Sequence, residues 1–138
     1  MSGDGSASAW LEAGIVGRDP ERLPRFYTDV MGFEVVHRTH FDEFGTVLQL
    51  RRDRARMKLY FPADAALDAP RDDDPWYRAG GFRYAALVLD SAAAVDALVQ
   101  ECVANGGRVL VEPREHRPGA HVALVTDPEG NPWELLHG

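Results

Sequence analysis

Apolar residues recur with helical spacing at two places in the chain. In the first half they stand at positions i, i+3, i+4, i+7 and i+8. These residues are Leu23, Phe26, Tyr27, Val30 and Met31. The second half repeats the pattern 72 positions later, at Val95, Leu98, Val99, Cys102 and Val103. Because this spacing puts the apolar side chains on one helical face, it predicts one helix in each half.

The same offset of 72 relates the strands that precede the two helices, since Ile15 and Val16 correspond to Leu87 and Val88. Short apolar segments typical of strands follow each helix. They cover residues 33–40, 46–50 and 57–61 in the first half and 108–112, 121–126 and 133–137 in the second. Each half is therefore predicted to be β-α-β-β-β, which makes the fold class α+β with two tandem modules.

Turn and cap residues support these boundaries. Asp19-Pro20 and Asp90-Ser91 can cap the starts of the two helices, and Gly32 can end the first one. The expected organisation is a flexible N-terminus at 1–9 and a single domain over 10–138. Within that domain we expect module one at 10–61, a connector at 62–81 and module two at 82–138.

Composition narrows the classes of partner. The chain has 138 residues, of which 45% are hydrophobic, enough for one domain to bury a core without disulfides. A net charge of -7 argues against binding to nucleic acids or anionic membranes. The single cysteine, Cys102, belongs to the apolar helical face and is expected to be inert. Neither a signal peptide nor a membrane-length apolar run is evident, so we expect a cytoplasmic protein.

Two segments resemble a known family. Residues 19–36, DPERLPRFYTDVMGFEVV, resemble the helix and turn that open proteins of the vicinal oxygen chelate superfamily, which includes glyoxalase, bleomycin-resistance and dioxygenase-like proteins. Residues 127–135, DPEGNPWEL, resemble the hairpin and strand that close them, although a local turn also explains this stretch. The resemblance extends from Trp10 to His137. It implies two mixed sheets curled into a cup with the helices outside, and a homodimer.

Strand alternation assigns side chains to the two faces of each sheet. Leu11, Ala13 and Ile15 are expected to face the helix, which leaves Trp10 and Glu12 on the cup side. The same rule sends Lys58, Tyr60 and Glu134 to the cup, and the offset of 72 relates Glu12 to Tyr84.

The resemblance also raises the question of a metal. In metal-dependent relatives, His and Glu on the first and last strands of each module hold a divalent ion, and these positions correspond here to Glu12, Lys58, Tyr84 and Glu134. Only Glu134 matches the ligand expected at its position. Glu12 replaces the expected histidine with a carboxylate that can still bind a hard cation, but the ammonium group of Lys58 would repel a metal ion. Lys58 can instead pair with Glu134 or Glu12. We therefore expect no metal and no cofactor. The histidine spacing does not suggest a ligand set, although His121 can reach a pocket.

The first functional hypothesis is a metal-free binding protein of the bleomycin-resistance type, which sequesters a hydrophobic or aromatic molecule or antibiotic. The residues expected to contact that ligand are Trp10, Glu12, Lys58, Tyr60, Trp76, Tyr84, His121 and Glu134, with Phe44 as a further aromatic candidate. Trp76 lies in the connector, where it either packs on the domain or forms part of a lid.

Two enzymatic alternatives and one structural alternative stay open. A lyase, isomerase or epimerase would use Glu134 as general base and Lys58 or Tyr84 to stabilise an oxyanion. A metal-dependent glyoxalase or dioxygenase would need Lys58 to move away. A purely structural Lys58–Glu134 salt bridge could instead close the cup.

Overall fold

The computed structural model describes residues 8–63 and 80–138. The expectations for residues 1–7 and for Trp76 in the connector lie outside the described residues. The elements of module one are β1 (Ala13–Val16), α1 (Arg22–Arg25), the π-helical segment η1 (Phe26–Val30), β2 (Glu34–Phe41), β3 (Gly45–Arg52) and β4 (Ala55–Pro62). Those of module two are β5 (Ala85–Val88), α2 (Ala92–Ala104), β6 (Val109–Arg117), β7 (Ala120–Thr126) and β8 (Pro132–His137).

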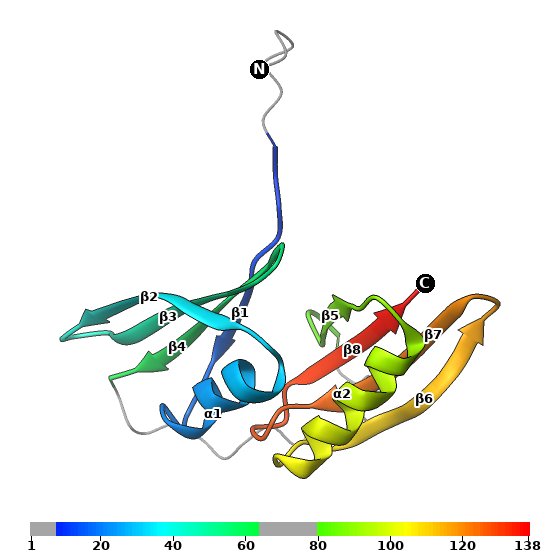
Figure 1. Cartoon of the computed structure of the whole chain (residues 1–138). Helices are drawn as coiled ribbons and strands as arrows, with labels where there is room; N and C mark the ends of the chain where they lie inside the picture. The colour runs from blue at the N-terminus through cyan, green and yellow to red at the C-terminus, as the bar shows by residue number, and fades with distance from the viewer. Residues whose placement is uncertain (1–7, 64–79) are drawn as a thin grey trace, which may run out of the picture.

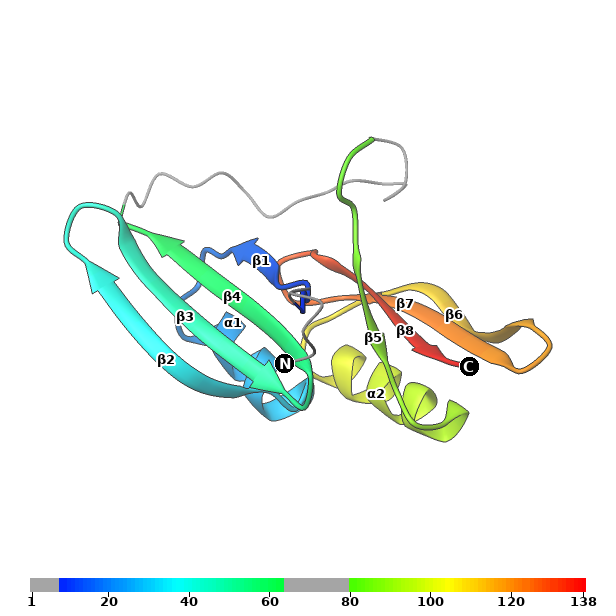
Figure 2. The ribbon, with the colours of Figure 1, turned by 90° about the horizontal axis from the view of Figure 1, so that it is seen from above.

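The two modules have the same sheet topology. Each forms a four-stranded sheet, in the orders β1-β4-β3-β2 and β5-β8-β7-β6. β1 pairs with β4 in parallel and β5 pairs with β8 in parallel, whereas the remaining pairs are antiparallel. The two sheets lie side by side without closing into a barrel (Figures 1 and 2). This arrangement confirms the predicted α+β fold with two β-α-β-β-β modules.

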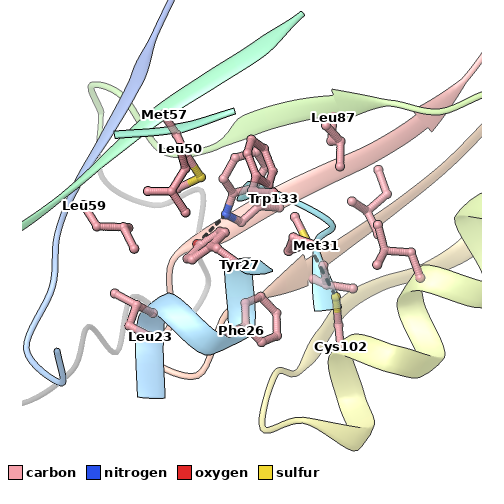
Figure 3. Close-up of a cluster of buried hydrophobic side chains, with 14 of the residues drawn as sticks. Leu23, Phe26, Tyr27, Met31, Leu50, Met57, Leu59, Leu87, Cys102 and Trp133 are labelled. Carbon is pink, nitrogen blue, oxygen red and sulfur yellow. Dashed lines mark hydrogen bonds between the residues drawn. The ribbon is translucent and has the colours of Figure 1, made fainter. Parts of the chain in front are cut away.

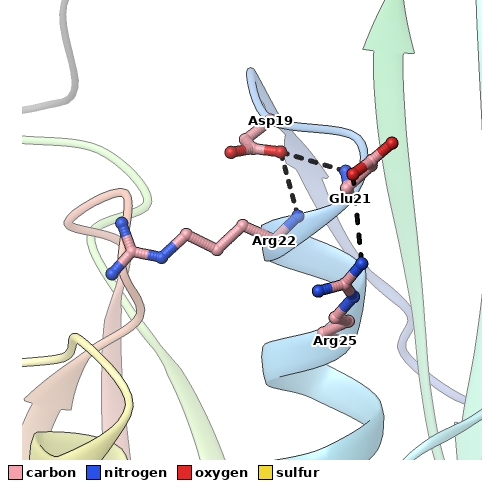
Figure 4. A network of polar contacts seen from close by, with 4 residues as sticks. All are labelled: Asp19, Glu21, Arg22 and Arg25. Carbon is pink, nitrogen blue, oxygen red and sulfur yellow. Dashed lines mark hydrogen bonds and ion pairs between the residues drawn. The ribbon is translucent and has the colours of Figure 1, made fainter.

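The helix starts follow the predicted caps. Asp19 Oδ1 accepts hydrogen bonds from the backbone N–H groups of Glu21 and Arg22, at 3.0 and 2.9 Å (Figure 4). These bonds lower the pKa of the Asp19 carboxyl, because they stabilise its charged form. In module two, Ser91 Oγ accepts a hydrogen bond from Ala94 N at 3.0 Å. Both caps satisfy backbone donors that the first helical turn leaves free.

Four elements differ from the sequence prediction. β1 and β5 begin at Ala13 and Ala85, so Trp10, Glu12 and Tyr84 precede these strands instead of lying on them. The first helix changes from α to π geometry, with the Met31 N–H donating to the Phe26 carbonyl five residues earlier. β6 continues to Arg117 instead of ending near residue 112. It continues because the polar residues after 112 still pair with β7, as in the Glu115–His121 pair, while their side chains stay at the surface. Because these residues are polar, the sequence pattern did not predict the long hairpin that β6 and β7 form.

One hydrophobic core joins the two modules. Leu23 and Met31 from module one and Cys102 from α2 are fully buried, and Trp133 from β8 is nearly so (Figure 3). Met31 Sδ and Cys102 Sγ lie 4.0 Å apart, where the first helix meets α2. The expected helix-facing residues of β4 and β8 are buried as predicted: Met57, Leu59, Phe61, Trp133 and Leu135. Within the described residues, no helix is long and apolar enough to cross a membrane.

Candidate functional site

A buried hydrogen-bond network fixes the two modules against each other. Tyr27 in η1 donates its hydroxyl proton to Asp127 Oδ2 at 2.6 Å, and Trp133 Nε1 donates to the Tyr27 hydroxyl at 2.9 Å. Figure 3 shows the Tyr27 and Trp133 side chains meeting between the modules. Burial, and then the adjacent Asp127 carboxylate, raise the pKa of Tyr27 well above its ordinary value of 10.0. Tyr27 therefore stays a protonated donor.

The turn that follows β7 depends on the same carboxylate. Asp127 Oδ1 accepts from the backbone N–H groups of Glu129 and Asn131, and Asp127 Oδ2 accepts from Asn131 Nδ2 at 2.8 Å. Glu129 then reaches module one, where its two carboxylate oxygens accept from Arg18 N and Asp19 N at 2.8 and 2.9 Å. The turn within the sequence signature at 127–135 is thus a joint between modules as well as a local hairpin.

A pocket opens beside this joint, where the two pseudo-equivalent strands β1 and β5 begin. Its volume is about 360 Å³. The lining comes from three segments, and its members are Leu11, Glu12, Ala13, Gly14, Ile15, Phe82, Arg83, Tyr84, Ala85, Asn131, Pro132 and Trp133. The walls are largely apolar and aromatic, with Glu12 and Arg83 as charged groups. Asn131 and Trp133 belong both to the joint and to the pocket lining, so the hydrogen bonds of the joint hold one wall of the pocket in place.

Lys58 pairs with Glu12. Lys58 Nζ lies 3.5 Å from Glu12 Oε1, and the two side chains are 47% and 34% exposed. Lys58 stands beside Gly14 in the β1–β4 register, whereas Glu134 lies on β8 beside Ala86 of β5. The structural alternative of a buried Lys58–Glu134 salt bridge is therefore wrong. Lys58 forms its ion pair with Glu12, within module one, and this pair is half-exposed.

The remaining predicted ligand contacts are dispersed. Tyr84 lines the pocket, but Lys58, Tyr60 and Glu134 are not among its lining residues. The Tyr60 hydroxyl donates to the Phe44 carbonyl at 2.6 Å. Trp10 is 66% exposed, and the guanidinium carbon of Arg56 lies 5.5 Å from the centre of its ring.

His121 is not among the pocket-lining residues, contrary to expectation. Its Nε2 lies 2.8 Å from Asp96 Oδ1 on α2, so the side chain points to the helix side of β7. The reason is register: His121 shares the helix-facing side with the buried residues Ala123 and Val125.

Sequence reasoning named only Glu12 and Tyr84 among the lining residues and missed the others, including Phe82, Arg83 and Asn131. Phe82 and Arg83 immediately precede the predicted Tyr84, in the segment that leads into β5. Asn131 belongs to the turn within the 127–135 signature. Because local turn formation already explained that stretch, no sequence pattern indicated that Asn131 lies at the pocket.

The residues at the metal-binding positions of the family do not fit a divalent ion. Of the four, Lys58 carries a cationic group that lies 3.5 Å from the Glu12 carboxylate and would repel a divalent ion there. In the described part of the chain, no three His, Cys, Asp or Glu side chains converge as a ligand group. These side chains therefore support no chemical step through a metal, and the metal-free state stays a prediction.

The fold is a two-module α+β arrangement with a pocket between the modules. Residues 10–135 match the family model of the Glyoxalase/Bleomycin resistance protein/Dioxygenase superfamily, and the chain belongs to that superfamily. No curated protein matches the chain significantly.

Solved structures of the same fold cover nearly the whole chain. The crystal structure of SMU.1112c is 27% identical with a TM-score of 0.72, over 95% of this chain and 99% of that one. A glyoxylase/bleomycin resistance protein/dioxygenase domain from Frankia sp. EAN1pec has a TM-score of 0.77 at 16% identity, over 96% and 93%. A glyoxalase family protein from Enterococcus faecalis has a TM-score of 0.67 at 21% identity, over 91% and 93%.

Proposed function

We propose that this protein binds and sequesters a hydrophobic or aromatic small molecule, in the manner of a metal-free bleomycin-resistance protein. The observation that carries the proposal is the pocket of about 360 Å³ between β1 and β5. That volume lies within the range of small-molecule sites, which are mostly apolar and have a few oriented polar groups. Tyr84 and Phe82 supply exposed aromatic surface, while Glu12 and Arg83 supply charge.

The pocket supports binding better than catalysis. The enzymatic alternative needs Glu134 to reach a substrate proton while Lys58 or Tyr84 reaches the developing oxyanion of the same substrate, because both groups act at hydrogen-bond distance. Of these three residues only Tyr84 lines the pocket. A binding protein needs only the shape and the aromatic walls.

The test is calorimetric titration of the protein with ethidium and other planar aromatic compounds, and separately with bleomycin. Tyr84→Ala should weaken binding by about tenfold or more, because aromatic stacking on a planar ring contributes roughly 1–3 kcal/mol. Phe41→Ala is the matched control, since Phe41 is similarly exposed, at 47% against 50%, and lies outside the pocket lining. Absence of binding to every compound, or equal losses in both variants, would refute the proposal.

The metal-free state has its own test. Elemental analysis of the purified protein, followed by thermal melting with Mn²⁺, Ni²⁺, Zn²⁺, Fe²⁺ or EDTA, should show neither a stoichiometric metal nor metal-dependent stabilisation. Strong stabilisation that EDTA reverses would instead favour a metal-dependent glyoxalase or dioxygenase.

We further propose that the protein is a homodimer of the reducing cytoplasm. Val16 on β1 and Val88 on β5 are related by the offset of 72 and are 59% and 67% exposed. A second copy that covers both would remove apolar surface from water. The free, buried thiol of Cys102 is compatible with a reducing compartment. Light scattering during size exclusion should give twice the chain mass, and a monomer would contradict the proposal.

A further inference from the structure

Gly14 occupies the middle of β1 without a steric or conformational reason inside the described chain. A Cβ built on it meets nothing within 4 Å, and its φ is not in the left-handed region. The other glycine in a described strand, Gly45, has both reasons: its φ is +115°, and a Cβ there would collide with the Phe61 carbonyl oxygen. Chain packing thus explains Gly45 and leaves Gly14 unexplained.

Glycine inside a strand weakens the strand, because the unfolded chain loses more conformational freedom and no side chain packs in return. A strand glycine often marks a place where a ligand or another backbone approaches closely. Gly14 lines the pocket, follows Glu12 by two residues and pairs in register with Lys58. Bare backbone therefore lies open at the pocket beside the Glu12–Lys58 ion pair.

We propose that Gly14 is the specificity-determining floor of the pocket, and that a planar aromatic ligand lies with its ring face against the β1 backbone there. The inference rests on the proposed function and refines it by naming the ligand shape. A flat ring can approach a peptide backbone closely only where no side chain stands between them. Tyr84, which also lines the pocket, offers an aromatic surface to the same ligand.

The experiment is a size series at one position, Gly14→Ala, Gly14→Val and Gly14→Leu, titrated with ethidium by fluorescence. Affinity should fall as the side chain grows, by about tenfold or more for leucine, because a single added methylene in a fitted pocket changes binding by roughly 10- to 200-fold. The melting temperature should stay unchanged or rise, since each substitution replaces a strand glycine in open space. A purely structural role for Gly14 would instead lower the melting temperature.

Val35→Leu is the matched control, because it enlarges an exposed side chain of another strand, β2, that does not line the pocket. It should bind ethidium within about twofold of the wild type. If Gly14→Leu also binds within about twofold while the wild type binds well, the inference is overturned and the proposed function stands. If the Gly14 variants change the mass measured by light scattering, Gly14 serves contact between copies, and the inference is again overturned. If the wild type binds no planar aromatic compound, the proposed function fails and the inference with it.

Discussion

Replacing Tyr27 by phenylalanine tests whether the hydroxyl at the module joint stabilises the whole domain. The hydroxyl donates to Asp127 and accepts from Trp133 Nε1, and the tyrosine side chain is fully buried. Phenylalanine keeps the ring and its edge-on contact with Phe26, at 5.4 Å between ring centroids. The substitution therefore removes the two hydrogen bonds and little else.

The expected loss follows from those two bonds. A hydrogen bond to a charged group contributes about 1.5–3 kcal/mol, and leaving the Trp133 N–H buried without an acceptor costs about 1–3 kcal/mol. Because the two effects share one hydroxyl they do not simply add, and we expect the free energy of unfolding to fall by about 3 kcal/mol. Asp127 keeps the three bonds from Glu129 and Asn131, so the turn itself should persist.

Urea unfolding monitored by tryptophan fluorescence measures this change directly. Tyr60→Phe is the control, because that hydroxyl also donates one bond of 2.6 Å, to the Phe44 carbonyl, but in an exposed setting. The control should lose less than about 1 kcal/mol. A Tyr27→Phe loss as small as that of the control would show that the buried network does not hold the modules together.

Three further outcomes are expected. Burial raises the pKa of Cys102 from 9.0 to about 12, so the wild type should lose about 1.4 kcal/mol of stability per pH unit as pH rises above 9, where only the unfolded thiol ionises. Cys102→Ala should lack this slope in urea unfolding between pH 8 and 10, and an unchanged slope would contradict the assignment. Gly45→Ala should yield little folded protein by circular dichroism, whereas Gly14→Ala should fold normally; equal yields would be inconsistent with the Gly45 geometry. Lys58→Met should change the free energy of unfolding by less than about 1 kcal/mol, because its ion pair is half-exposed, and a larger loss would indicate a buried bridge.

Much of the fold was predictable because it depends on local periodicity. The offset of 72 between Leu23 and Val95 identified the two modules, and alternation along β4 correctly buried Met57 and Leu59. These predictions succeed because the spacing of 3.6 or 2 residues fixes which side chains share a face, whatever lies opposite. The polar end of β6 was not predicted as a strand, because its pairing with β7, and not its composition, makes it one.

The sequence alone therefore determined the two modules, their helix and strand faces and the family they resemble. Only the tertiary structure decided which residues meet. Glu12 pairs with Lys58 while Glu134 stays on the other sheet, and His121 turns toward Asp96 on α2. The turn around Asp127 looked purely local, yet it joins the modules through Tyr27 and places Asn131 at the pocket. Such contacts depend on how two sheets and two helices pack, and residue spacing within one segment carries no information about the segment that will lie against it.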